Sequence, residues 1–135
     1  MHVESYIKLE NKHFIEMGLT NKQKYMLFIL GEYYNKERGR LKKEFLDIAI
    51  SKPVFIDLVL SSGLVSKKSR AVYKNLEMLE RKKLIYYENR MLKMTALGLK
   101  RFQELEAAIS PYLIAMQILK SGKARAKKTQ SVFSE

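Results

Sequence analysis

The most informative segment of the chain is SRAVYKNLEMLERKKLIYYENRMLKMTALG, residues 69–98. Val72, Leu76 and Leu79 are spaced by four and three residues, so in a helix they form one apolar stripe. The pattern predicts an amphipathic helix over about 67–83, with its apolar stripe on a core. The opposite face of this helix would carry mostly cationic side chains: Lys67, Arg70, Lys74, Glu77 and Arg81.

Two short apolar runs follow this helix and predict a β-hairpin. They are Ile85–Tyr87 and Met91–Met94, separated by the tripeptide Glu88-Asn89-Arg90. Asparagine tolerates the left-handed backbone that a tight turn requires. We therefore expect a short two-stranded wing with a basic residue near its tip.

Another helix is predicted before the basic one. Ser51 can cap it, because a serine hydroxyl accepts a hydrogen bond from the first helical turn, and Pro53 is tolerated in that turn. Ser61-Ser62-Gly63 predicts a turn. Residues 53–94 then have the order helix, turn, helix, hairpin, which is the order of a winged helix-turn-helix.

The basic helix has the features that a DNA recognition helix needs. An apolar stripe holds it on the domain, and long cationic side chains can reach the major groove and its phosphates. Arginine can bond guanine with two hydrogen bonds, whereas lysine more often contacts phosphate. We expect the helix over 67–83 to lie in the major groove, aided by the wing over 85–94. The expected DNA contacts are Lys67, Lys68, Ser69, Arg70, Tyr73, Lys74 and Arg90.

The segment 69–98 resembles the recognition helix and wing of MarR/PadR/TrmB-type winged-helix transcription regulators. Those proteins typically carry V-Y-x-x-L-x-x-L-E-x-x-G-L-I, a wing, and then L-T-x-x-G at the start of a helix. The matching residues are Val72, Tyr73, Leu76, Leu79, Glu80, Leu84, Ile85, Thr95 and Gly98. The resemblance implies a dimeric DNA-binding regulator in which Tyr73 touches a phosphate. This chain departs from the pattern at Lys83, where the family usually has glycine, and in a longer turn over 61–65.

The N-terminal half is expected to be helical as well. We predict helices over about 4–17 and from Thr20 to about residue 36. Thr20 and Gln23 have the spacing of a capping box, and Gly39 is expected to break the second helix. A further helical spacing follows at Leu41, Phe45 and Ile48.

The C-terminal region predicts one more long helix, which suggests a dimer. Thr95 can cap this helix, Ser110-Pro111 predicts a kink or restart near residue 110, and Gly122 ends it. The helix is more apolar than a solvent-exposed helix should be, so we expect a symmetric homodimer through about 96–120. The alternative is that the helix folds back on its own domain. The expected dimerisation residues are Phe102, Leu105, Ile109, Leu113 and Met116.

The charge of the chain is concentrated in its C-terminal half. The 135 residues include 26 Lys and Arg against 14 Asp and Glu, a net charge of +12. Residues 1–66 have 10 basic and 8 acidic side chains, whereas residues 67–135 have 16 and 6. Such an asymmetry favours a polyanionic partner. The absence of cysteine excludes disulfides and thiolate metal sites and fits a cytoplasmic protein, and no apolar run is long enough to span a membrane.

These features predict a mainly α fold with a small β-hairpin, built as a winged helix-turn-helix with flanking helices. The expected parts are an N-terminal helix (1–19), the DNA-binding domain (20–95), a dimerisation helix (96–121) and a basic disordered tail (122–135). We expect a sequence-specific regulator that binds double-stranded DNA as a homodimer. The alternatives are a nonspecific or architectural nucleic-acid binder and a winged-helix protein-interaction module.

No enzyme activity, metal or cofactor is expected from the sequence. It contains no glycine-rich phosphate loop, no His-Glu-x-x-His motif and no nucleophile elbow. His2 and His13 are isolated from other metal-ligand residue types. No set of residues specifies a pocket for a small-molecule effector, so the question of an effector stays open.

Overall fold

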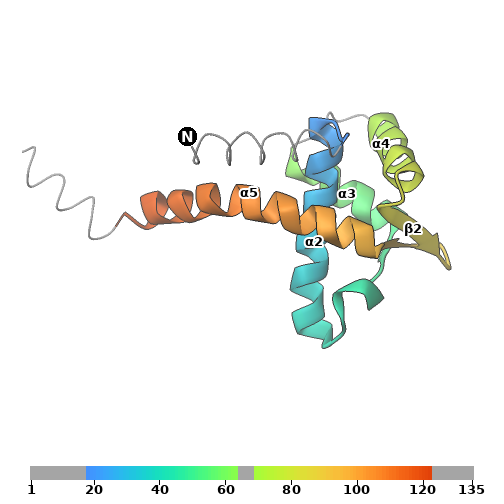
Figure 1. Ribbon diagram of the computed structural model, residues 1–135, viewed down its shortest axis with the longest axis horizontal. Coiled ribbons are helices and arrows are strands. Elements are labelled where there is room, and N and C mark those ends of the chain that lie inside the picture. Colours follow the sequence, from blue (N-terminus) through green and yellow to red (C-terminus); the bar gives the residue numbers. More distant parts are fainter. Residues whose placement is uncertain (1–17, 64–68, 123–135) are drawn as a thin grey trace, which may run out of the picture. The chain divides into compact units, whose positions relative to one another are not determined.

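A computed structural model describes residues 18–63 and 69–122 of the chain (Figure 1). In these residues the fold is mainly helical, with a small three-stranded antiparallel sheet. The predicted helix over 4–17 and the predicted tail beyond Gly122 lie outside the described residues. The elements in chain order are α2 (Asn21–Leu41), the 3-10 turn η1 (Phe45–Asp47), β1 (Ile50–Ser51), α3 (Lys52–Ser62), α4 (Ser69–Arg81), β2 (Ile85–Glu88), β3 (Met91–Met94) and α5 (Ala96–Ser121).

Helix α2 begins at a capping box, as predicted. The Thr20 hydroxyl accepts a hydrogen bond from the Gln23 backbone N–H at 3.2 Å, and the Gln23 side chain accepts one from the Thr20 N–H at 3.2 Å. The predicted end near Gly39 is wrong, because the helix continues to Leu41 and ends at Lys42 in a left-handed conformation with φ of 55°. A glycine costs a helix only about 1 kcal/mol relative to alanine, which the neighbouring turns outweigh.

The predicted helical turn from Leu41 to Ile48 is also wrong. Only the short 3-10 turn η1 forms there, and Ile48 already has extended backbone. Phe45 and Ile48 are nevertheless buried in the core. Their spacing of three reflects burial from an irregular segment, which periodicity alone cannot distinguish from a helix.

The predicted β-hairpin is confirmed, and a third strand joins it. Strands β2 and β3 pair in antiparallel with Glu88 opposite Met91, so the turn contains only Asn89 and Arg90. Both turn residues have positive φ, 52° and 64°. Strand β1 pairs with the other edge of β3, which makes the order β1-β3-β2. Alternation could not predict β1 because the strand has two residues.

Helices α3 and α4 form at the predicted places. Ser51 caps α3 by accepting a hydrogen bond at 3.4 Å from the backbone N–H three residues further on. Gly63 ends α3 with a left-handed φ of 72°. Helix α4 runs from Ser69 to Arg81, within the predicted span, and residues 64–68 before it lie outside the described part.

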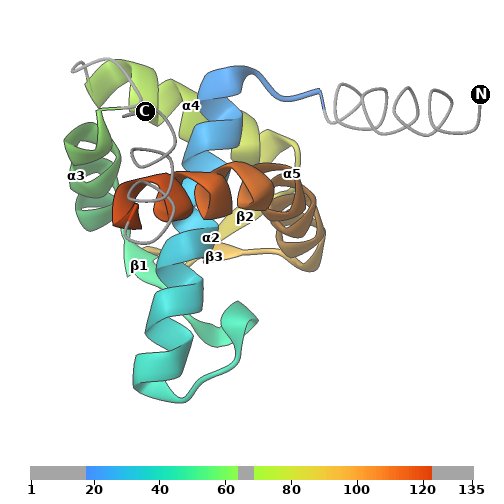
Figure 2. The ribbon, with the colours of Figure 1, turned by 90° about the vertical axis from the view of Figure 1, so that its left-hand side faces the viewer.

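Helix α2 packs against α3 and α4 in the core (Figure 2). The buried Tyr34 hydroxyl donates a hydrogen bond to the Leu92 carbonyl at 2.5 Å and so ties α2 to the sheet. Phe102 of α5 stacks on Phe45, with ring centroids 5.8 Å apart. Gly31 of α2 leaves the space that the Phe102 ring occupies, since a Cβ there would overlap the ring.

Phe102 and Leu105 therefore belong to the core of their own domain. Each is only 1% exposed. Their assignment to a dimerisation stripe is corrected, because side chains enclosed by their own chain offer no surface to a second one.

Helix α5 is continuous from Ala96 to Ser121. The Thr95 hydroxyl caps it, as predicted, by accepting a hydrogen bond from the Gly98 N–H at 2.9 Å. The helix does not restart at Pro111, which lies inside it. Proline has no N–H and so cannot donate to the carbonyl four residues earlier, which leaves one helical hydrogen bond unmade.

The chain divides into two compact units, Met1–Leu105 and Glu106–Glu135. We call residues 106–121 of the second unit the distal part of α5. Its side chains from Pro111 to Ser121 are exposed. None of the helices in the described ranges combines the length and the apolar character that crossing a membrane would require.

Candidate nucleic-acid interface

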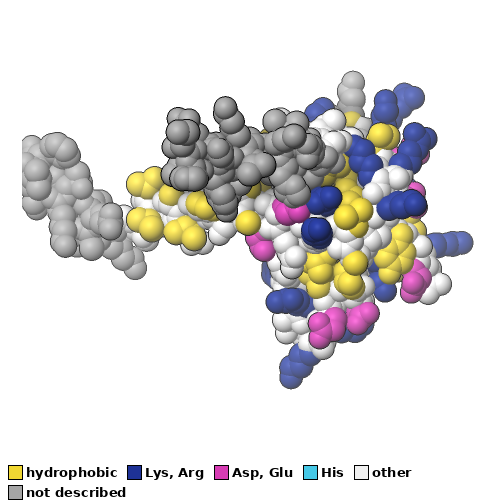
Figure 3. Space-filling view, viewed as in Figure 1, with side chains coloured by type: hydrophobic (Ala, Val, Ile, Leu, Met, Phe, Trp, Pro, Cys, Tyr) yellow, Lys and Arg dark blue, Asp and Glu magenta, His cyan; other side chains and the backbone are white. Residues whose placement is uncertain are grey.

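Helix α4 has one buried and one exposed face, as predicted. Val72, Leu76 and Leu79 have no exposed surface. The opposite face carries Ser69, Arg70, Tyr73, Lys74, Glu77 and Arg81, all exposed. We call Arg70, Lys74 and Arg81 the basic face of α4. Figure 3 shows Lys and Arg side chains gathered on the side of the molecule that bears α4 and the hairpin.

The orientation of α4 is set by polar contacts with α2. The Gln23 side chain, which is 4% exposed, donates a hydrogen bond to Asn75 Oδ1 at 3.3 Å. Lys82, just after α4, donates to Gln23 Oε1 at 3.3 Å and to the Gly18 carbonyl. Gln23 thus caps α2, and it also connects α2 to Asn75 within α4 and to Lys82 just after α4. Directional hydrogen bonds fix the rotation of α4 about its axis more strictly than apolar packing alone does.

The basic side chains of the site are not neutralised within the structure. Among residues 18–63 and 69–122, neither Arg70, Lys74 nor Arg90 has a carboxylate at ion-pair distance. Other basic residues do: Arg40 pairs with Glu37 at 2.5 Å. Unpaired cations raise the local positive potential, which attracts a polyanion.

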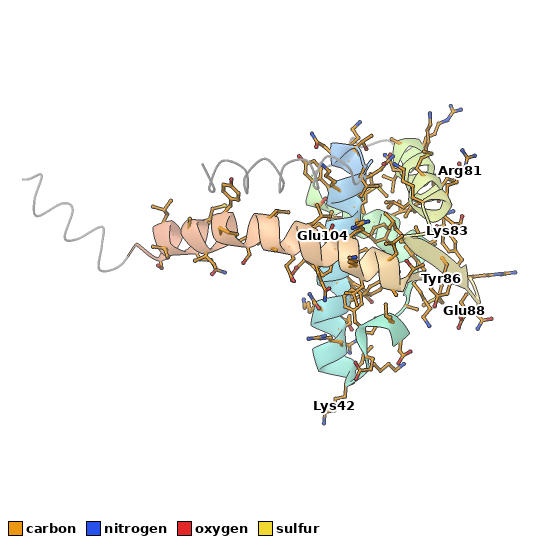
Figure 4. All side chains as sticks on the ribbon, in the orientation of Figure 1. Lys42, Arg81, Lys83, Tyr86, Glu88 and Glu104 are labelled. Carbon is orange, nitrogen blue, oxygen red and sulfur yellow. The ribbon has the colours of Figure 1, made fainter. Side chains whose placement is uncertain are left out.

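The hairpin places Arg90 at its tip. Glu88 and Lys93 pair weakly across the hairpin at 3.9 Å, on the face that also carries Tyr86 (Figure 4). Because the turn has only two residues, few side chains beyond Arg90 and Asn89 can extend from this end. The hairpin tip therefore offers one long cationic side chain.

Lys52, Tyr73 and Tyr87 form a cluster that sequence analysis did not predict. The Lys52 ammonium lies 4.9 Å from the Tyr73 ring centroid and 5.3 Å from that of Tyr87. These residues come from α3, α4 and β2, and we call them the Lys52 cluster. Their separation along the chain leaves no periodic signal, so only the tertiary structure reveals the cluster.

The environment of the Tyr87 hydroxyl disfavours its ionisation. Burial, followed by the negative charges of Glu80 and Glu77, raises its pKa to about 12. Each of these effects disfavours a phenolate. A tyrosine hydroxyl is a hydrogen-bond donor at neutral pH in any case, and the raised pKa extends this role to more alkaline pH.

The structure gathers most of the predicted DNA contacts but not all of them. Ser69, Arg70, Tyr73 and Lys74 share the exposed face of α4, and Arg90 lies at the hairpin tip. The predicted contacts Lys67 and Lys68 lie outside the described residues.

The distal part of α5 is a second candidate surface. Ile109, Tyr112, Met116 and Leu119 are spaced by three, four and three residues, and they continue the spacing of the buried Phe102 and Leu105. We call these four residues the distal seam. Tyr112 is 73% and Leu119 is 80% exposed. Figure 3 shows hydrophobic side chains along the visible face of this part of α5.

The chain was compared with family models, curated proteins and solved structures, and no significant match was found in any of the three comparisons.

Proposed function

We propose that this chain is a transcription regulator that binds double-stranded DNA sequence-specifically as a homodimer through a winged helix-turn-helix. The observation that carries this proposal is the exposed basic face of α4, which no carboxylate of residues 18–63 and 69–122 pairs with and which lies opposite a fully buried apolar stripe. A surface helix needs no such concentration of cations for folding. A recognition helix needs both faces.

The order of elements supports the winged-helix part of the proposal. Helix α3, helix α4 and the β2–β3 hairpin follow one another in the chain, and β1 completes a three-stranded sheet. In a helix-turn-helix the first helix crosses the DNA backbone while the second enters the major groove. Helices α3 and α4 would take these two roles.

Affinity and specificity come from different side chains in this proposal. Lys74, Arg81 and Arg90 would neutralise phosphates, which supplies affinity that falls with salt concentration. Arg70 lies in the first turn of α4, the part of a recognition helix that faces base edges. Its guanidinium can make two hydrogen bonds to guanine and so read sequence.

The distal seam supports the dimer. Residues 107–119 contain no charged side chain, and a helix so apolar is normally covered. A spacing of three and four is the pattern of helix pairing with a second helix. The acidic Glu106 and the basic Lys120 flank this segment, so two copies that pair in antiparallel place opposite charges at each end. We therefore propose an interface at Ile109, Tyr112, Met116 and Leu119. The predicted contact Leu113 is also exposed but lies one residue outside this spacing.

Selection from a random-sequence duplex pool across a salt series tests this function. We expect binding that weakens steeply as salt rises, and a retained pool that converges on a palindrome whose half-sites lie about one DNA turn apart. Binding without convergence would favour the architectural alternative. No binding even at low salt would refute both and leave the protein-interaction module.

The Arg70→Ala variant tests whether the Arg70 side chain distinguishes DNA sequences. We expect it to weaken binding to the selected site by about 1–3 kcal/mol and to relax the choice of base at one position. The control is Arg38→Ala, which removes an exposed arginine of α2. Equal weakening on every sequence would show that Arg70 contacts phosphate only.

A further inference from the structure

The Lys52 ammonium is held in place without being neutralised. It lies over the rings of Tyr73 and Tyr87, and no carboxylate of the described residues lies within ion-pair distance. Most exposed lysines are instead free to sample many rotamers. Lys52 is only partly exposed, which fits a side chain laid against aromatic surfaces.

Two aromatic rings position this cation but do not satisfy its hydrogen-bond donors. The attraction between an ammonium and a ring face is electrostatic, and it leaves N–H donors directed away from the rings. The same cluster contains two phenolic hydroxyls, and that of Tyr87 stays protonated at neutral pH. A fixed cation with phenolic hydroxyls in the same cluster matches an oxyanion, because the ammonium and the hydroxyls can each donate a hydrogen bond to it.

The position of the cluster indicates which oxyanion it would bind. Tyr73 belongs both to the Lys52 cluster and to the exposed face of α4, between Arg70 and Glu77 along one side of the helix. An anion bound at Lys52 would therefore lie beside the surface that we assign to the major groove. The phosphates that border the groove are the anions at that place.

We propose that Lys52, with Tyr73 and Tyr87, forms a binding site for a backbone phosphate of duplex DNA, distinct from the base-reading side chains of α4. This inference rests on the proposed function. In it, α3 contributes a charge that is ordered before binding, so little side-chain entropy is lost when the phosphate arrives. The site helps to set the position of α4 on the duplex and carries no sequence information of its own.

The acidic residues near the cluster allow a second test of the site. Glu77 and Glu80 are close enough to influence the Tyr87 hydroxyl. Their negative charge opposes a phosphate at Lys52, so Glu77→Gln is expected to strengthen binding at low salt by up to about threefold, an effect of the size expected for one screened charge.

The decisive comparison is between Lys52→Met and Lys42→Met. Methionine keeps a long apolar side chain over the rings while removing the charge. Lys42 lies at the far end of α2, away from the hairpin (Figure 4), so its variant loses the same charge elsewhere. Binding to the selected duplex and to an unrelated duplex is measured at several salt concentrations, and the fold of each variant is checked by thermal unfolding.

We expect Lys52→Met to weaken binding about three- to tenfold on both duplexes and to lower the salt slope by about 1, as loss of one phosphate contact does. Lys52→Arg should retain binding, because it keeps both the charge and the stacking on tyrosine. Lys42→Met should leave the slope nearly unchanged.

The outcomes separate the two proposals. If Lys52→Met and Lys42→Met behave alike while the unmodified chain binds a selected sequence, the phosphate site is refuted and the proposed function stands. If Lys52→Met lowers the slope but no sequence is selected, the site stands and sequence-specific regulation fails. Should Lys52→Met be unfolded, Lys52→Gln decides by the same slope, and Glu77→Gln decides by the expected gain in binding at low salt. Absence of any duplex binding refutes both proposals.

Discussion

Two glycines of α2 have opposite consequences for the same substitution. At Gly31 an added Cβ would overlap the Phe102 ring, whereas at Gly39 it would meet nothing within 4 Å. Both positions are helical, so alanine gains about 1 kcal/mol of helix propensity at each. Only at Gly31 does that gain compete with overpacking of a core aromatic residue.

We expect Gly31→Ala to destabilise the chain by about 1–3 kcal/mol, because the Phe102 ring or α5 must shift. Gly39→Ala should stabilise it by about 0.5–1 kcal/mol. Urea unfolding followed by circular dichroism measures both. Equal effects of the two substitutions would contradict the packing of Phe102 against α2.

Lys83 adopts the backbone conformation that glycine favours. Its φ is 61°, at the place where the resembled family usually has glycine. The left-handed region costs a residue with a Cβ roughly 1–2 kcal/mol. Neighbouring contacts stabilise this conformation, since the Lys83 carbonyl accepts a hydrogen bond from the Thr95 hydroxyl at 2.7 Å.

Lys83→Gly is therefore expected to stabilise the chain by up to about 1 kcal/mol, after allowance for the greater freedom of glycine in the unfolded chain. The control is Lys100→Gly within α5, where the same change should destabilise by about 1 kcal/mol. Chemical unfolding of both variants measures these changes in the free energy of unfolding. A loss of stability in Lys83→Gly would show that the left-handed backbone there is not strained.

At the scale of elements, the two prolines lie in different helical settings. Pro53 lies in the first turn of α3, where the missing N–H has no helical partner in any case. Pro111 lies inside α5, where it removes one hydrogen bond and crowds the preceding turn. The same residue type is thus harmless in α3 and costly in α5.

We expect Pro111→Ala to increase amide-exchange protection in the distal part of α5, by an amount approaching the roughly 3 kcal/mol that an interior proline costs. The unfolding midpoint of the first unit should change little, because the substitution lies outside Met1–Leu105. Pro53→Ala serves as the control, with little change in exchange. A large shift of the whole unfolding transition by Pro111→Ala would show that the two units unfold together.

At the scale of the whole molecule, the distal seam and the basic face of α4 are expected to act together in DNA binding. Under the proposed function, two domains joined through the seam would bind two half-sites, so the second contact would form at a high effective concentration. The seam spans fewer than two heptads, which predicts a dimer that forms reversibly with concentration rather than an obligate one.

A charge placed in the seam tests this dimer. Met116→Glu should raise the dimer dissociation constant at least tenfold, because a carboxylate would be buried in the interface. Gln117→Glu introduces the same charge one residue further on, outside the seam, and should have little effect. Sedimentation equilibrium measures both. If Met116→Glu and Gln117→Glu associate alike, the seam is not the interface.

The sequence by itself determined the elements whose signals are local. Capping at Thr20, Ser51 and Thr95 depends on residues three positions apart, and the stripe of α4 depends on a helical repeat. The turn at Asn89 and Arg90 depends on a backbone conformation that few residue types tolerate. Each of these signals is complete within about one helical turn or one hairpin, so it can be interpreted without knowing what packs against it.

Only the tertiary structure decided the features that join distant segments. The sequence spacing could not tell that Phe102 and Leu105 enter their own core while Met116 stays exposed, because one apolar stripe serves either purpose. It also could not predict strand β1 or the Lys52 cluster. The physical reason is the same in each case: burial, strand pairing and cation–ring contact depend on distances in space between residues that the chain separates.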